Sequence, residues 1–306
     1  MDTKFSKRGG VFISCDVATI DFVVAEFMTE QKLRGNTVKT MQYYEAVFKK
    51  FRAFSDCELV TDISLPLCKR YALYLMECGI NSVSVQSYLR GFRAFLSWLY
   101  ISGYISENLS EEFKLPKAHK AVINVLTVTE IELLLSQFDD TFLGRRNRCM
   151  CLLMLDSGLR SGEAVLLASE RVHLDERYVI VDGKCNKERI VPLSIDTTEA
   201  LQEYLNVKPK SDFFFCNVQG KEISTETVKD FFKDLKQVKG LERIYPHLLR
   251  HTFATMYLEN GGNIYNLQSI LGHTTLEMVK RYLHMSRYAV LQDFDSLHPC
   301  VKLNAL

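Results

Sequence analysis

The feature that most constrains the fold of this chain is the apolar periodicity of its first third. Between Asp16 and Tyr104 hydrophobic residues recur at i, i+3 and i+4, and no stretch shows the alternation of a half-buried strand. Breaks at Gly35, Gly79 and Gly103 divide the pattern. The sequence therefore predicts an all-helical unit, with helices over residues 20–33, 37–54, 64–77 and 83–103.

Beyond Leu126, helical patterns surround two β-rich runs. The runs cover residues 177–181 and 188–193, and the segment Asp182–Lys187 between them has the turn chemistry of a hairpin. Helices are predicted on both sides of the hairpin, over residues 131–138, 143–156, 225–238, 246–259 and 275–284. The expected fold class is mainly α with a small antiparallel β-sheet.

The chain of 306 residues is longer than a typical single domain, which favours two domains. Between the two patterned regions lies a polar stretch with one proline and a basic end, typical of an interdomain linker. The predicted division is an N-terminal arm (1–15), a helical domain (16–104), a linker (105–122), a mixed α/β domain (123–288) and a C-terminal tail (289–306).

Composition excludes several classes of protein. No apolar run reaches the length of a membrane span, and the basic N-terminus lacks the apolar core of a secretory signal, so we expect a cytoplasmic protein. The nine cysteines are scattered and form no C-x-x-C, which argues against a disulfide framework or a zinc site. The net charge of +1 leaves DNA binding open, because DNA requires a basic face rather than a basic total.

Candidate DNA-contacting residues lie on the polar faces of the helical unit and in the linker. A basic linker between two lobes would suit a clamp around a polyanion, although a solvated surface explains such residues equally well. The candidates are Lys39, Lys49, Arg52, Arg90, Arg93, Lys117 and Lys120.

Residues suited to phosphodiester chemistry occur in the second half. Breaking this bond without a metal requires cationic donors for the non-bridging oxygens, a nucleophile and a proton donor for the leaving oxygen. Arg160 follows a predicted helix end, and Glu163 could hold it in place. Arg250 lies three residues after His247 on one predicted helix, so both face one side. Taken alone, an arginine near a helix start is usually a surface residue, and His247 would more often be a structural histidine.

A metal site is not indicated by the histidines. His247 and His251 stand at i and i+4, but the glutamate of the H-E-x-x-H zinc motif is missing. The phosphate-binding sequence G-x-x-x-x-G-K-[ST] is also absent. No cofactor is expected.

Five segments, taken together and in order, closely resemble the catalytic boxes of the tyrosine recombinases, the family that includes Xer recombinases and the integrases of phages and transposons. The resemblance covers the whole chain, with the helical unit similar to the family's core-binding domain and the region after Leu126 to its catalytic domain. The segments are Leu155–Glu163, Gly183–Leu193, His247–Thr255, Leu271–His273 and Tyr282.

The resemblance assigns a role to each matching residue. It implies that Arg160 and Arg250 form a phosphate clamp, which Glu163 supports, and that His247 is a proton-transfer partner. It also implies that His273 is a further phosphate donor, Lys184 the general acid for the departing 5′ oxygen and Tyr282 the nucleophile. Tyr282 follows His273 by nine residues, the family's usual spacing.

Two departures from the family pattern leave every catalytic group in place. Ser161 and Gly162 replace the more usual aliphatic-serine pair before Glu163, and Cys185 replaces the glycine common after the hairpin lysine. The second change could alter how far the turn bends and how well Lys184 reaches a phosphate.

The resemblance implies a two-domain C-shaped clamp that performs site-specific strand exchange through a 3′-phosphotyrosine, for a mobile element or for dimer resolution. The implied partners are a double-stranded DNA recombination site, further copies of this chain in a synaptic tetramer, and accessory DNA-bending or directionality proteins; on DNA the protein would be nucleoid-associated. A type IB topoisomerase and a catalytically silent DNA-binding architectural protein are the alternatives.

Overall fold

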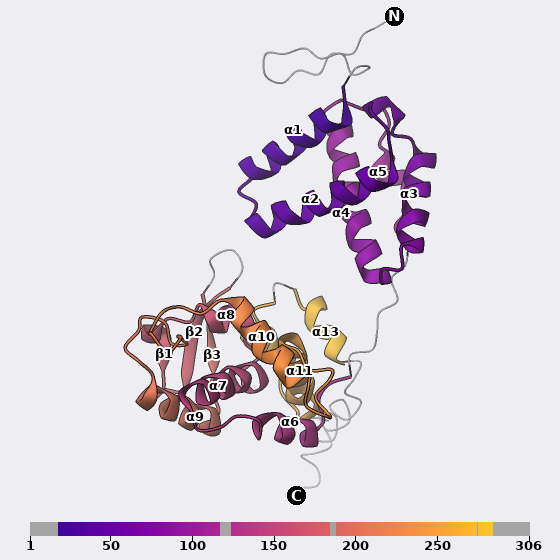
Figure 1. Ribbon diagram of the computed structural model, residues 1–306. Coiled ribbons are helices and arrows are strands. Elements are labelled where there is room, and N and C mark those ends of the chain that lie inside the picture. Colours follow the sequence, from indigo (N-terminus) through magenta and orange to yellow (C-terminus); the bar gives the residue numbers. More distant parts are fainter. Residues whose placement is uncertain (1–17, 117–123, 184–187, 274, 284–306) are drawn as a thin grey trace, which may run out of the picture. The chain divides into compact units, whose positions relative to one another are not determined.

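The computed structural model describes residues 18–116, 124–183, 188–273 and 275–283. The chain divides into two compact units, Met1–Val122 and Ile123–Leu306 (Figure 1), and each has its own hydrophobic core. No helix within the described ranges is both long and apolar enough to cross a lipid bilayer.

The first unit is built from helices, as the periodicity predicts. Its four long helices each begin after a Ser, Thr or Asn whose side chain accepts a hydrogen bond from the backbone N–H three residues later, which satisfies an otherwise unpaired donor. The elements are α1 (Ile20–Leu33), α2 (Val38–Phe54), the 3-10 turn η2 (Val60–Asp62), α3 (Leu65–Glu77), α4 (Ser82–Ile101) and α5 (Leu109–Glu112).

An aromatic cluster holds the helices of the first unit together. Phe27 of α1 makes edge-to-face contacts with Phe48 of α2 and Phe95 of α4, with ring centroids 5.7 and 5.5 Å apart. Tyr43 of α2 also donates a 2.6 Å hydrogen bond to the carbonyl of Ser87 in α4. The polar faces of α2 and α4 are therefore fixed relative to one another by the packing beneath them.

The second unit surrounds a small sheet with helices (Figure 1). The sheet is antiparallel in the order β1 (Val172–His173), β2 (Tyr178–Asp182), β3 (Glu188–Pro192). The helices are α6 (Val128–Leu135), α7 (Phe142–Asp156), α8 (Ser161–Val165), the 3-10 turn η3 (Ser169–Arg171), α9 (Ile195–Val207), α10 (Thr225–Leu235), α11 (Pro246–Glu259), α12 (Ile264–Leu271) and α13 (Glu277–Leu283). The mainly α fold with a small antiparallel sheet is confirmed.

The core of the second unit determines which strand residues face inward. Val191 of β3 is buried, and residues two apart on a strand share one face of the sheet. Arg189 therefore lies on the same face as Val191, and it pairs in register with Val181 of β2, which is also buried. This register directs the side chain of a charged residue toward the interior.

The structure corrects several predicted elements. Helices α9 and α12 were not predicted: two adjacent threonines, Thr197 and Thr198, weaken the helical pattern of α9, and α12 is a short helix between two glycine breaks. The helix expected over residues 131–138 is α6, which begins earlier because Thr127 and Glu130 form a capping box at its start. The two-residue strand β1 is too short for its pattern to be recognised.

Candidate active site

Helix α11 carries the most deeply buried cation of the candidate site, Arg250, which is 4% exposed. Its guanidinium donates to the carbonyl of Gly158 and, at 2.7 Å, to that of Leu271, and lies 3.2 Å from Nε2 of His273. Because a guanidinium can only donate, Nε2 of His273 is the acceptor. Among the described residues, these contacts engage three of the five N–H groups of Arg250, which leaves donors for an anion.

A glycine is required where the chain approaches Arg250. Gly158 has φ +64°, and a Cβ at this position would lie 2.5 Å from the ring of Phe253. Only glycine can therefore hold this turn closely enough against α11 for its carbonyl to accept from Arg250. The turn also carries Arg160, two residues further on.

Arg160 is held at the start of α8 by Glu163. The carboxylate of Glu163 accepts from the backbone N–H of Arg160 at 2.8 Å and from its Nη1 at 2.7 Å. The side chain of Arg160 remains 28% exposed. Glu163 thus contacts Arg160 as the sequence predicts, and the Arg160 side chain stays partly accessible.

The charges of the site do not balance. Burial and the nearby charge of Arg160 lower the pKa of Arg250 to about 9, so Arg250 still carries its charge at neutral pH. Burial alone would raise the pKa of Glu163, but hydrogen bonds from Arg189 and Arg160 outweigh it and hold that pKa below its ordinary value. One ionised carboxylate therefore faces three guanidinium groups, which leaves a net positive, partly desolvated cluster.

Tyr282 lies on α13 and is buried, with 2% of its surface exposed. Its hydroxyl is 2.8 Å from Nδ1 of His251, and the two rings are 5.7 Å apart. Its ring packs in a small apolar cluster with Phe253 and Val279. The phenol also lies close enough to Arg250 to affect the pKa of that residue. The candidate nucleophile is thus tied to the helix that carries Arg250.

The remaining predicted catalytic residues differ in position. His273 is buried beside Arg250, directly after the left-handed C-cap Gly272 of α12. His247 lies on the first turn of α11 and is exposed. Lys184 falls outside the described residues. The described structure therefore brings together Arg160, Glu163, Arg250 and His273, with Tyr282 adjoining them.

Two residues of the site are not predicted from the sequence. The histidine pattern raises His251 only as a metal ligand, although its place directly after Arg250 is a signal that it could share the site. Arg189 was not singled out, and its contact with Glu163 joins residues 26 positions apart. No group of three or more His, Cys, Asp or Glu side chains that could hold a metal ion occurs within the described ranges.

The site residues fall within regions matched by known family profiles. The Phage integrase family profile matches residues 124–288, and that of the Phage integrase SAM-like domain matches residues 21–115. The chain belongs to the phage integrase family. The resemblance to the tyrosine recombinases inferred from the five segments is confirmed.

Individual relatives agree with this membership. The tyrosine recombinase XerD of Listeria monocytogenes serotype 4b is 30% identical over 280 residues, or 87% of this integrase and 94% of that relative. The Tn1549 transposon integrase in complex with a circular intermediate DNA superimposes with a TM-score of 0.73 at 19% identity, covering 88% of this chain and 98% of that one. A lambda integrase dimer bound to a COC′ core site gives a TM-score of 0.73 at 18% identity, covering 87% and 95%. The two structural likenesses show a shared fold.

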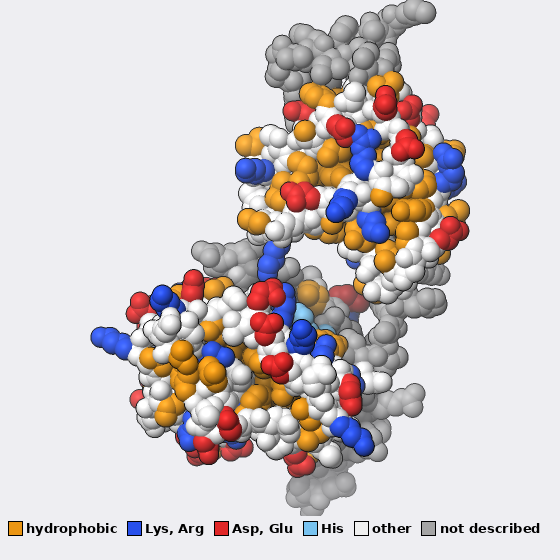
Figure 2. All heavy atoms as spheres, in the orientation of Figure 1, with side chains coloured by type: hydrophobic (Ala, Val, Ile, Leu, Met, Phe, Trp, Pro, Cys, Tyr) orange, Lys and Arg blue, Asp and Glu red, His pale blue; other side chains and the backbone are white. Residues whose placement is uncertain are grey.

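The basic residues of the first unit of this integrase are not equivalent. Arg52 bonds to the carboxylate of Asp21 and, at 2.8 Å, to the carbonyl of Cys57, so it links α1, α2 and the following turn. The other described candidates are exposed: Lys39, Lys49, Arg90 and Arg93. On the face shown in Figure 2, lysine and arginine side chains are interspersed with acidic ones. Lys117 and Lys120 lie outside the described residues.

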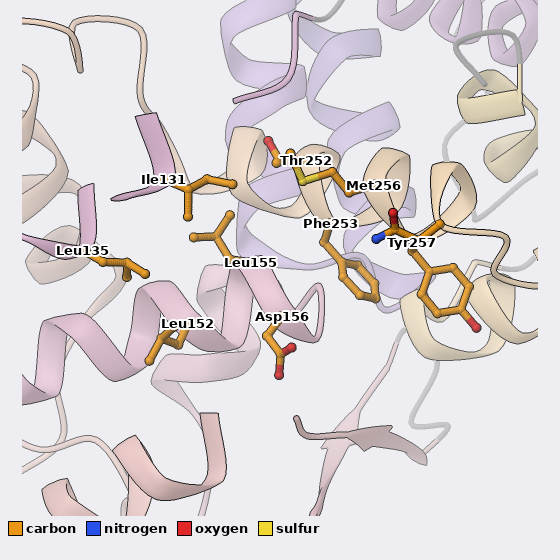
Figure 3. A pocket seen from close by; sticks show the side chains of 10 residues that line it. Ile131, Leu135, Leu152, Leu155, Asp156, Thr252, Phe253, Met256 and Tyr257 are labelled. Atoms are coloured by element: carbon orange, nitrogen blue, oxygen red, sulfur yellow. The ribbon is translucent and has the colours of Figure 1, made fainter. Parts of the chain in front are cut away.

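An apolar pocket of about 370 Å³ lies between α6, α7 and α11 of the integrase (Figure 3). Ile131, Leu155, Met256 and Asp156 are among the residues that line it. Asp156 is itself engaged, because its carboxylate accepts a 2.9 Å hydrogen bond from the backbone N–H of Ser194. None of the described candidate catalytic residues lines this pocket.

Proposed function

We propose that this integrase is a site-specific recombinase that cleaves and rejoins double-stranded DNA through a 3′-phosphotyrosine formed at Tyr282. It would act in the integration or excision of a mobile element or in the resolution of replicon dimers. The observation that carries the proposal is the unbalanced cation cluster around Arg250, which adjoins the phenol of Tyr282. A phosphodiester is the anion that this combination of donors and nucleophile suits.

In the proposed reaction the scissile phosphate enters between Arg160 and Arg250. Their outward N–H groups would bind the two non-bridging oxygens and stabilise the charge that builds up as phosphorus becomes five-coordinate. His273, which accepts from Arg250 at 3.2 Å, would orient that guanidinium and add a contact to the phosphate. Such donors are effective because they are fixed before the substrate arrives.

Proton transfer completes the step. The phenol oxygen of Tyr282 attacks phosphorus, a Tyr–O–P bond forms, and the bond from phosphorus to the 5′ oxygen breaks. The phenol proton leaves toward His251, whose Nδ1 is 2.8 Å away, and Lys184 would protonate the departing 5′ oxygen. His247, on the same helix, remains the proposed hydrogen-bonding and proton-transfer partner at the phosphate. Reversal by a new 5′-hydroxyl rejoins the strand without ATP.

A covalent adduct is the direct test. The protein is incubated with nicked duplexes drawn from the DNA that flanks its own gene, and also with a randomised duplex pool, and products are separated under denaturing conditions. We expect a protein–DNA adduct from the wild-type chain and none from Tyr282→Phe. An adduct that persists in Tyr282→Phe would refute the assignment of the nucleophile.

The same preparations distinguish the alternatives. A recombinase requires a particular paired site, whereas a type IB topoisomerase would relax any supercoiled plasmid. A silent DNA-binding protein would shift the duplex without forming an adduct. The role of Lys184 is tested with a bridging 5′-sulfur at the cleaved position, because a thiolate leaves without protonation. This substrate should restore cleavage by Lys184→Ala but not by Arg160→Ala.

We extend the proposal to assembly. The helical domain (16–104) and the catalytic domain (123–288) would close around DNA as a C-shaped clamp through the linker (105–122), with four copies forming the synaptic complex in the cytoplasm and accessory DNA-bending or directionality proteins assisting. The apolar tail after Tyr288 would dock on a neighbouring copy. Deleting this tail should leave single-site adduct formation intact and weaken synapsis, as measured by light scattering of the DNA complex; unchanged synapsis would refute it.

A further inference from the structure

We propose that Arg189 is a positioning residue that sets Arg160 of the phosphate clamp and the turn bearing His273 relative to one another. The inference rests on the proposed function of that clamp. Arg189 lies on β3 with its side chain 9% exposed, and Glu163, which it contacts, is 10% exposed. Both charges are thus withdrawn from water into the interior of the second unit.

The first contact of Arg189 is a bidentate pair with Glu163. Nη1 donates to Oε1 at 2.9 Å, and Nη2 donates to Oε2 at 2.8 Å. The same two oxygens accept from Nη1 and the backbone N–H of Arg160, at 2.7 and 2.8 Å. Because the carboxylate is shared in this way, the position of Arg189 fixes the carboxylate, and the carboxylate fixes Arg160.

The second contact of Arg189 reaches α12. Its Nε donates at 2.7 Å to the carbonyl of Ile270, in the last turn of that helix. Gly272, the C-cap, has φ +63°, and a Cβ there would lie 2.9 Å from Cδ of Arg189. The arginine side chain therefore packs directly against the turn that leads into His273, and glycine is required both for the left-handed backbone and for this close approach.

These two contacts use different N–H groups of one planar side chain. Nη1 and Nη2 donate to Glu163 while Nε donates to the carbonyl of Ile270, so the rigid guanidinium connects the carboxylate to the end of α12. A lysine at this position has one charged nitrogen and cannot reproduce the arrangement. Arg189 follows Lys184 by five residues in the sequence, so the strand β3 that comes after the proposed general acid carries the residue that positions Arg160.

An ordinary structural ion pair would stabilise the fold without affecting the clamp. Arg171 provides the contrast: it pairs with Asp182 of β2 and Glu188 of β3, at 3.1 and 2.9 Å, but its side chain is 31% exposed and neither partner belongs to the site. The substitution Arg171→Lys is therefore a matched control for Arg189→Lys, because it makes the same chemical change against the same sheet.

The experiment measures anion binding first, independently of DNA cleavage. Inorganic phosphate is titrated into protein labelled with ¹⁵N-arginine, and the side-chain Nε–H signals are followed. In the wild-type chain, phosphate should shift the signal of Arg160 and leave that of Arg189 nearly in place, because the donors of Arg189 are already engaged. An equal shift at Arg189 would make it a phosphate ligand and overturn the proposal.

The variants then test whether Arg189 acts through Arg160. Arg189→Lys should weaken phosphate binding about tenfold or more, the effect of losing hydrogen bonds between charged groups. In the double variant with Arg160→Lys, the two substitutions together should weaken binding by less than the product of their separate effects, since Arg160→Lys removes one of the two groups through which Arg189 acts. Arg171→Lys should match the wild type. Independent, multiplying effects of the two substitutions, or unchanged affinity in Arg189→Lys, would overturn the proposal.

The rate of adduct formation on a duplex that reacts with the wild-type chain supplies the second readout. Arg189→Lys should slow single-turnover adduct formation at subsaturating DNA by at least the factor lost in phosphate affinity, because the clamp that binds the phosphate also binds the transition state. If the wild-type chain forms no adduct with any duplex while Arg189→Lys still weakens phosphate binding, the recombinase proposal fails and the positioning role stands. A slower rate with unchanged phosphate binding and an unchanged Arg160 signal would refute positioning instead.

Discussion

Replacing Glu163 by glutamine removes one charge from the site with almost no change in shape. The carboxylate accepts four hydrogen bonds, two from Arg189 and two from Arg160, at 2.7 to 2.9 Å. In Glu163→Gln one oxygen becomes an NH₂ group, so two of these contacts become donor against donor. Breaking a buried ion pair from one side costs about 3–5 kcal/mol, and we expect a loss of this size in the free energy of unfolding. That loss is a large part of the ordinary stability of a domain.

The assay can be confined to the affected unit. The only tryptophan, Trp98, lies in the core of the first unit, so its fluorescence follows that unit, whereas circular dichroism follows both. In urea, Glu163→Gln should move the circular dichroism transition of the second unit and leave the Trp98 transition in place. Glu226→Gln is the control, because its pair with Lys229 is exposed and such pairs contribute about 1 kcal/mol or less.

The stability loss in Glu163→Gln should depend on pH and on phosphate. The pKa of Glu163 is held below its ordinary value, so the stability that the carboxylate supplies is present above about pH 4.3 and is lost as the pH falls through the lowered pKa. The difference in free energy of unfolding between the wild type and Glu163→Gln should therefore be constant from pH 5 to 8 and become smaller in acid.

Phosphate should restore part of the stability lost in Glu163→Gln, because an anion neutralises the exposed excess of guanidinium charge. A loss below about 1 kcal/mol at pH 7 would refute the view that this carboxylate balances buried cations.

Three further perturbations test separate parts of the second unit. His251→Leu should slow adduct formation about tenfold through loss of the hydrogen bond to Tyr282, and His251→Asn, whose amide reaches the position of Nδ1, should recover part of the rate in the same single-turnover assay. Gly272→Ala should destabilise the second unit by about 1–2 kcal/mol in urea, since its φ of +63° is strained for any other residue. Glu130→Gln should remove a contribution of about 1 kcal/mol or less to the free energy of unfolding. Contact with Arg243 lowers the pKa of Glu130 to about 2, so the wild type loses this stability between about pH 4.5 and 2, while the variant does not. An equal loss of stability in acid for both proteins would contradict the assignment of this contribution to Glu130.

The helices of the first unit could be predicted because their signals are local. Thr37, Ser64 and Asn81 each precede an apolar-periodic run, and each caps the helix that follows. The same rule applies to α9, which Ser194 caps, but the adjacent threonines in its first turn obscured the periodicity. Local pattern therefore predicted elements where capping and periodicity agreed, and missed them where only one was clear.

The contacts within the site could not be predicted in this way, because they join distant positions. Arg189 reaches Ile270 across 81 residues, and His251 reaches Tyr282 across 31. Neither spacing leaves a periodic trace in the sequence. The polar face of α2 showed a related limit: Arg52 was grouped with surface cations, yet it bonds Asp21, which is 31 residues earlier. A charged residue on a helix face gives no indication of whether an acidic partner from another element already engages it.

Helix α11 shows where local geometry stops determining the site. A spacing of three residues places His247 and Arg250 on one side of the helix, as the sequence predicts, yet Arg250 is buried and His247 is exposed. The difference arises along the helix axis, because Arg250 lies about 4.5 Å further from the start of the helix, where the turn at Gly158 and the end of α12 approach. The burial of Arg250 is therefore set by carbonyl groups that lie 92 and 21 residues away in the sequence, and a substitution that moved either carbonyl would alter the clamp without touching any catalytic residue.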